Sequence, residues 1–89
     1  MNAIITVVGN DKVGIIAAVS SFLAEHKINI ADITQTILSG NFVMMMMVSF
    51  ENADIAIDEL REALSKKAEE MNVEINVMSE KVFSAMHRV

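Results

Sequence analysis

The chain has 89 residues, of which 53% are hydrophobic and 4% aromatic, with no cysteine and a net charge of −5 at pH 7. This length predicts one domain, 1–89, with a modest core. The absence of thiols excludes disulfides and thiolate metal sites, and only seven basic residues argue against a nucleic-acid partner. The longest apolar run, 42–48, is too short to cross a bilayer, so we expect a cytoplasmic protein with no membrane partner.

The first predicted elements are a strand and a helix joined by a glycine-flanked turn. The apolar run from Ala3 to Val8 predicts a central strand, because such a strand is buried on both faces. A helical stripe follows from Val13 to Glu25. The turn between them, 9–14, leaves backbone N–H groups at a positive helix end and therefore favours a small anion such as a carboxylate. The alternative is a tight turn in which Asp11 only caps the helix.

The next two elements predict an antiparallel hairpin. Apolar residues change parity between Ile28 and Leu38, so we expect a bulge near Asp32 in this strand. Ser-Gly-Asn at 39–41 predicts a hairpin into a strand from 42 to 50. That strand holds four consecutive methionines, so both of its faces must be apolar. Core packing explains the run better than a copper site, because no His or Cys assists.

The second half of the chain predicts a helix, a strand and a tail. The helix runs to about Met71, with Asn52 or Asp54 as its expected cap. Its inward stripe is Ile57, Leu60, Leu64, Ala68 and Met71. Alternation from 73 to 77 predicts a half-exposed strand at a sheet edge. A short amphipathic stretch, about 80–88, predicts a C-terminal helix that packs on some surface.

The order of these elements predicts an α+β, ferredoxin-like βαββαβ fold over a core of 3–78. A four-stranded antiparallel sheet would carry both long helices on one face, with the short C-terminal helix added. The other face would then expose apolar residues of the first and third strands. We therefore predict that a second subunit, the C-terminal helix, or both cover this face.

The sequence predicts no catalytic residues, metal ligands or cofactor. Neither His26 nor His87 has a sequence neighbour that would act as an orienting carboxylate, and we interpret His26 as a helix-end residue. The first turn lacks the Cys-x-x-Cys of a heavy-metal carrier and the arginine of an acylphosphatase-like enzyme, and the central strands lack the aromatic residues of an RNA-recognition fold. A binding or interaction module remains.

Three segments carry a family resemblance: 8–16, Val-Gly-Asn-Asp-Lys-Val-Gly-Ile-Ile, then 22–25, Phe-Leu-Ala-Glu, and 28–30, Ile-Asn-Ile. Together they resemble the ACT domain, a small regulatory module of amino-acid metabolism. More narrowly, the chain resembles the single-ACT family UPF0237 and, more distantly, the glycine cleavage system regulator. The resemblance implies a homodimer or higher assembly that binds an amino acid between subunits, between the first loop and the start of the second strand.

The ligand-binding residues that the resemblance implies are Gly9, Asn10, Asp11, Lys12, Val13, Gly14, Ile15, Asn29 and Ile30. Asp11 or Asn29 would accept hydrogen bonds from the α-ammonium group, and main-chain N–H groups of 12–15 would donate to the α-carboxylate. The alternatives are Asp11 as a helix cap and Asn29 as an ordinary polar residue at a strand start. The sequence therefore predicts a regulatory homodimer that signals to an unknown partner protein; the alternative is a ligand-free dimerisation module.

Overall fold

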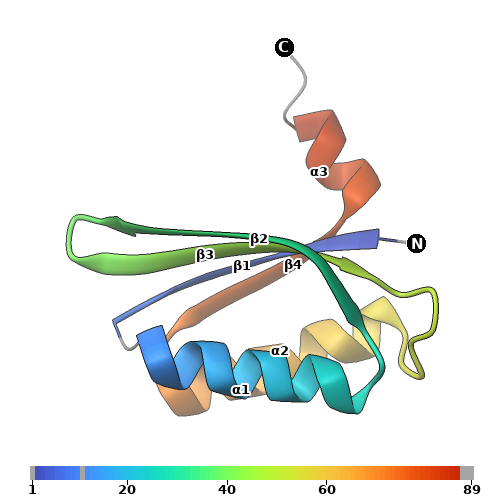
Figure 1. The fold of residues 1–89 in the computed structure, drawn as a ribbon, viewed down its shortest axis with the longest axis horizontal. Coiled ribbons are helices and arrows are strands. Elements are labelled where there is room, and N and C mark those ends of the chain that lie inside the picture. The colour runs from blue at the N-terminus through green and yellow to red at the C-terminus, as the bar shows by residue number, and fades with distance from the viewer. Residues whose placement is uncertain (1, 11, 87–89) are drawn as a thin grey trace.

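The computed structural model describes residues 2–10 and 12–86. Its elements are β1 (Asn2–Gly9), α1 (Lys12–Glu25), β2 (Asn29–Leu38), β3 (Asn41–Ser49), α2 (Ile57–Met71), β4 (Glu74–Ser79) and α3 (Glu80–Met86) (Figure 1). This is the predicted βαββαβ order followed by a short helix. The last residues of the predicted C-terminal helix, 87–88, lie outside the described residues.

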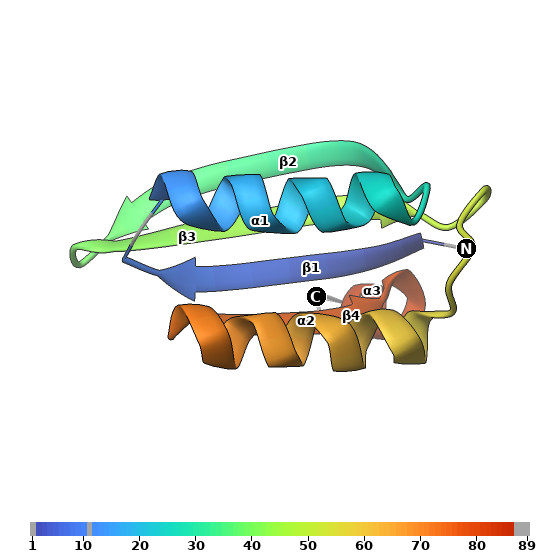
Figure 2. The same cartoon turned by 90° about the horizontal axis from the view of Figure 1, so that it is seen from below.

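The four strands form one antiparallel sheet in the order β2-β3-β1-β4. The central place of β1 and the edge place of β4 are both confirmed. Both long helices, α1 and α2, cover one face of the sheet, and α3 stands on the opposite, open face at one end (Figures 1 and 2). The sheet therefore has one face that carries both long helices and one that α3 covers only in part.

The core lies between the sheet and the two long helices. Its fully buried side chains include Ile5 and Val7 of β1, and Leu60 and Leu64 of α2. From α1 it takes Ile15, Val19 and Leu23, each 0% exposed, which are three members of the predicted stripe. The helical spacing of these residues places them on one side of α1, so burying them fixes how this helix lies on the sheet.

The methionine run of β3 divides between the two faces of the sheet. Met44 and Met46 are each 1% exposed and lie on the helix-covered face. Met45, which is 38% exposed, lies on the open face with Met47. Side chains alternate along a strand, so this division confirms that both faces of β3 are apolar.

The predicted bulge in β2 is confirmed, because the pairing register shifts between Ile30 and Asp32. The shift places Ile33 opposite Met46 and Ile37 opposite Phe42, both on the helix-covered face. Ile33 and Ile37 nevertheless remain 40% and 62% exposed, because β2 is an edge strand. The hairpin after it uses two residues with positive φ, at 39 and 40, as a type I′ turn requires.

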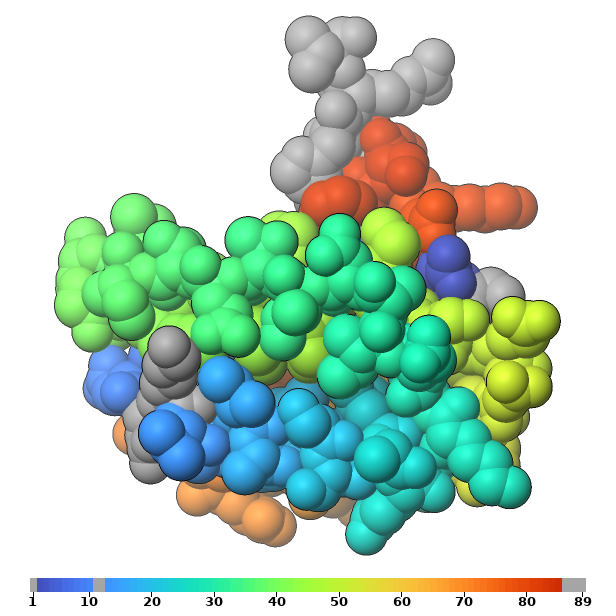
Figure 3. Space-filling view, in the orientation of Figure 1, coloured from blue at the N-terminus to red at the C-terminus, as the bar shows by residue number. Residues whose placement is uncertain are grey.

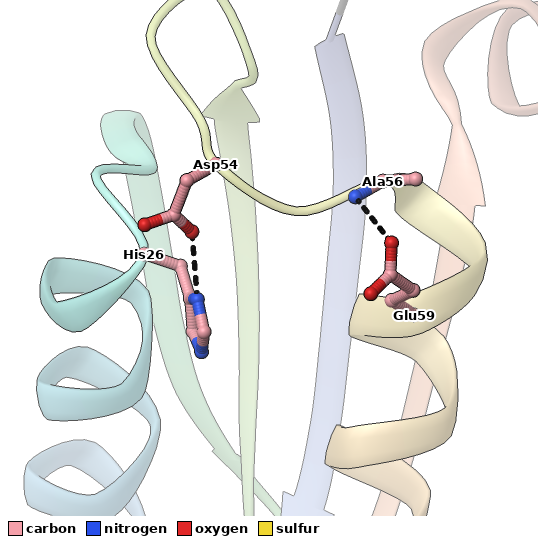
Figure 4. A network of polar contacts seen from close by, with 4 residues as sticks. All are labelled: His26, Asp54, Ala56 and Glu59. Atoms are coloured by element: carbon pink, nitrogen blue, oxygen red, sulfur yellow. Dashed lines mark hydrogen bonds and ion pairs between the residues drawn. The ribbon is translucent and has the colours of Figure 1, made fainter.

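The start of α2 differs from the prediction. Neither Asn52 nor Asp54 caps this helix; Ala56 stands at the N-cap, and its N–H donates a hydrogen bond to Oε1 of Glu59 at 3.4 Å (Figure 4). Alanine has no side-chain oxygen, so only the reciprocal half of a capping box forms. The expected cap residue Asp54 lies before the helix and is engaged by another side chain.

Candidate functional site

The turn after β1 leads directly into α1, as predicted. Because α1 begins at Lys12, the N–H groups of Lys12 and Val13 point out of the positive end of the helix. Asn10 is exposed, and the Val13 side chain is 78% exposed. Asp11, which we expected to cap the helix or to bind an ammonium group, lies outside the described residues. This corner of the molecule can therefore present donors to a carboxylate.

Two other predicted site residues are used by the core of their own chain. A Cβ atom on Gly9 would lie 2.5 Å from Cγ1 of Val73 and 2.7 Å from Cδ1 of Ile15, so internal packing alone requires glycine here. The Ile15 side chain is 0% exposed. Ile15 can therefore contribute to a site only through its main chain.

The remaining predicted residues lie at the other end of the sheet. Gly9 pairs with Phe42 beside the β2–β3 hairpin, whereas exposed Asn29 pairs with Ser49, which in turn pairs with Asn2. Seven residue steps along β1 separate these two ends, about 23 Å in an extended strand. Ile30, half-buried, follows Asn29 at the same end. One chain therefore does not bring the two halves of the predicted site together (Figure 2).

The two sheet edges differ in how they are protected. On β4, the Val77 carbonyl accepts a hydrogen bond from Nε of Arg61 at 3.1 Å, so a side chain of α2 occupies part of this edge. On β2, every residue from 31 to 38 is exposed. Figure 3 shows this strand, in teal to green, along the side of the molecule that faces the viewer. The β2 edge is the one open to another strand.

His26 lies at the end of α1, as predicted, and has a carboxylate partner that is not its sequence neighbour. Nδ1 of His26 lies 2.8 Å from Oδ1 of Asp54, 28 residues further along the chain, and the Asp54 N–H donates to the His26 carbonyl at 3.1 Å (Figure 4). The ring of Phe22 packs against His26 with centroids 4.7 Å apart. These contacts tie the end of α1 to the loop before α2, and so hold the start of β2 in place. No local motif signals such a pair, because only the topology of the sheet brings the two loops together.

The described hollows of the surface lie away from the turn. A groove of about 740 Å³ beside α3 is lined by Asn2, Ser79, Glu80, Lys81 and Ser84. A cavity of about 110 Å³ lies between α3 and the open face. Their described lining residues include neither the 9–14 turn nor the His26–Asp54 pair. Within one chain, therefore, neither hollow supplies an enclosing wall to the turn.

Comparisons with known proteins agree with this architecture. A family model described as the ACT domain matches residues 2–78. A UPF0237 protein of Methanopyrus kandleri is 49% identical over 98% of this chain and 97% of its own length. The solved structure of an ACT domain protein from Streptococcus pneumoniae is 45% identical, covers 98% of each chain and has a TM-score of 0.82.

A more distant likeness shows the fold alone. A candidate glycine cleavage system transcriptional repressor of known structure is 21% identical, with a TM-score of 0.73 over 86% of this chain and 44% of that longer one.

Within the described part of the chain, each helix falls short of the length and apolar character that crossing a bilayer requires.

Proposed function

The chain belongs to the ACT-domain family, and from this premise we propose that it is a cytoplasmic regulatory homodimer that binds an amino acid at a site shared by two copies. The observation that carries the proposal is the position of the site residues. The helix end at Lys12 and the strand start at Asn29 lie at opposite ends of one sheet. They form one site only if a second copy is placed in the opposite direction.

The sequence of the open edge supports such a pairing. Residues 33–37 read Ile-Thr-Gln-Thr-Ile, the same in both directions. If β2 of two copies pairs antiparallel about Gln35, each Ile33 faces an Ile37 and each Thr34 faces a Thr36. Cross-strand pairs of these kinds contribute about 0.2–1 kcal/mol each. The pairing would also cover the two exposed isoleucines, and the Arg61 hydrogen bond on β4 makes the other edge a poorer candidate.

The antiparallel direction completes the site. It places the start of β2 from one copy at the hairpin end of the other, which is the end where Gly9 and the first turn of α1 lie. A ligand there would direct its α-carboxylate to the N–H groups of Lys12 and Val13 of one copy, and its α-ammonium group to Asn29 of the other copy or to Asp11. The two-fold symmetry gives two such sites in each dimer.

Regulation follows from this shared arrangement. A ligand that contacts both copies binds only the paired form, so its binding free energy favours pairing and, by linkage, pairing favours the ligand. A partner protein that recognises the paired form would then respond to the amino acid. The alternative is a dimerisation module without a ligand, which is supported by Gly9, because internal packing already accounts for that residue.

The first test is thermal unfolding with each of the twenty amino acids. A ligand at a hundred times its Kd stabilises the protein by about 2.7 kcal/mol, which raises the Tm of a domain of this size by at least several degrees. Val13→Asp adds a carboxylate at an exposed position in the first turn of α1, where it also favours the helix. It should abolish the ligand-dependent shift, whereas the uncharged Val13→Asn should keep it and Asn29→Ala should reduce it.

Mixing variants tests whether two copies share the site. A mixed dimer of Val13→Asp and Asn29→Ala chains retains one intact site, made from the unaltered loop of one copy and the unaltered strand start of the other. Random mixing should therefore restore about one quarter of the wild-type binding capacity. No restoration would place the site within one chain. The absence of a shift with all twenty amino acids, in a protein that remains dimeric, would support the ligand-free module.

A further inference from the structure

The cavity between α3 and the open face of the sheet is lined by strand residues on one side and by α3 on the other. Its described lining residues are Ile4, Asp32, Ile33, Thr34, Met45, Met47 and Phe83. Pairing places Asp32 opposite Met47, and Met47 opposite Ile4, in one row across the open face. Phe83 of α3 lines the side of the cavity opposite this row. Ile4 is only 3% exposed although it belongs to the open face, as expected if α3 covers it.

The chemistry of this cavity is apolar with one charge. Two thioethers, the Ile4 side chain and a phenyl ring supply most of the lining, and Asp32 is its only charged residue among those described. Ile33 lines it through its main chain, because its side chain lies on the helix-covered face opposite Met46. Oδ1 of Asp32 accepts a hydrogen bond from the Ile33 N–H at 2.9 Å, which fixes the direction of the carboxylate. Among the described residues, no basic side chain forms an ion pair with Asp32. The carboxylate therefore has acceptor capacity left at the mouth of the cavity.

We propose that this cavity binds a small organic cation, with a primary ammonium group on Asp32 and a compact apolar body against Met45 and Met47 beneath Phe83. The Thr34 hydroxyl offers a second acceptor for the same group. The negative net charge of the chain adds to the attraction.

The size and donor set define the ligand class further. An enclosed apolar cavity of about 150 Å³ holds benzene, and this hollow of about 110 Å³ is partly open to solvent, so it accommodates a body of roughly four or five carbon atoms with one side exposed. A divalent metal ion bound directly by the protein fits poorly, because such an ion needs six or more oxygen ligands and the described side chains here offer only a carboxylate and a hydroxyl. An amino acid also fits poorly, because its carboxylate would meet Asp32 or an apolar wall. This site is separate from the shared site and does not depend on dimer formation.

The test is a titration with isopentylamine, observed by NMR of ¹³C-labelled methionine methyl groups. The signals of Met45 and Met47 should shift and saturate. Those of Met44 and Met46, each 1% exposed on the opposite face, provide an internal control and should stay in place. Isopentanol has the same body without the charge and should bind several-fold more weakly. Isovalerate, which carries a negative charge, should cause no saturable shift.

The matched variant is Asp32→Asn, which keeps an acceptor for the Ile33 N–H and removes the charge. It should weaken isopentylamine binding about three- to five-fold, the size expected for an exposed ion pair, and leave isopentanol binding unchanged. Equal binding of amine and alcohol, unchanged amine binding in Asp32→Asn, or no saturable shift at Met45 and Met47 would each overturn the proposal.

Discussion

Gly9 allows the packing of the β1–α1 corner to be tested with one methyl group. In Gly9→Ala the new Cβ would lie 2.5 Å from Cγ1 and 3.1 Å from Cβ of Val73, and 2.7 Å from Cδ1 of Ile15. The Ile15 contact involves the flexible end of a side chain, which can move. Val73 is β-branched and stiff at χ1, so its contacts require a shift of the main chain.

The expected cost follows from these contacts. Overpacking of this kind costs about 1–3 kcal/mol, and the lower chain entropy of unfolded alanine offsets about 0.4–1 kcal/mol of it. We therefore expect Gly9→Ala to lower the free energy of unfolding by about 1–2 kcal/mol, with a fall in Tm of about 4–8 °C for each kcal/mol. Urea and thermal unfolding of the purified variant measure both quantities.

A double-mutant cycle identifies the cause. Val73→Ala removes the closest atom, so combining it with Gly9→Ala should recover at least about 1 kcal/mol relative to additivity. Gly40→Ala is the control, because a Cβ there has nothing within 4 Å and the only cost is its φ of +80°. That variant should lose about 1 kcal/mol with no recovery from Val73→Ala. A neutral Gly9→Ala, or additive effects in the cycle, would refute this packing argument.

Two further predictions concern the ends of the helices. Lys27 follows α1 with a φ of 58°, a conformation that favours glycine, so Lys27→Gly should raise stability by up to about 1 kcal/mol in urea unfolding. Asn72 holds the equivalent place after α2, with a φ of 56°. Asn72→Gly should raise stability less than Lys27→Gly does, because asparagine tolerates positive φ better than lysine. An equal gain in stability from the two variants would contradict this explanation. The side chains of His26 and Asp54 are 31% and 50% exposed, so solvent should screen their interaction. A double-mutant cycle to alanine should give a coupling free energy below about 1 kcal/mol. A larger value would show that solvent screens this pair less than its exposure indicates.

Local patterns predicted the elements of the fold because the patterns act within single elements. The almost continuous apolar run of β1 indicated burial on both faces, and its place between β3 and β4 agrees. Adjacent methionines indicated two apolar faces of β3, and the contrast between Met44 and Met45 agrees. The change of parity around Asp32 indicated the bulge. Each inference used only the period of side chains along a strand.

Contacts between distant segments could not be predicted in this way. The His26–Asp54 pair joins two loops, 28 residues apart, that meet only after the sheet has formed. The cap of α2 was missed because alanine gives no signal at an N-cap; the only local sign was Glu59, which reaches back to it. Lys27 has a positive φ, and its residue type does not predict this conformation.

The candidate site shows what the sequence could predict and what only the structure could add. Through a family resemblance, the sequence predicted that the turn at 9–14 and the strand start at Asn29 belong to one site. Only the pairing register revealed that these parts lie at opposite ends of one chain. The register also revealed that an antiparallel second copy would bring them to the same end. The palindromic edge was visible in the sequence, but its meaning depends on β2 being an open edge.

The most direct measurement is disulfide trapping at the proposed two-fold axis. The chain has no cysteine, so a single Gln35→Cys substitution introduces the only thiol. In the proposed pairing this residue faces itself with Cα atoms about 4.5–5.5 Å apart, within the range that a disulfide spans. The matched control Thr34→Cys faces Thr36 of the other copy, so its own counterpart is a diagonal neighbour about 7–8 Å away, beyond the usual span of a disulfide. We predict a covalent dimer for Gln35→Cys under mild oxidation and little for Thr34→Cys; no covalent dimer for Gln35→Cys, or equal trapping of the two variants, would contradict the shared site.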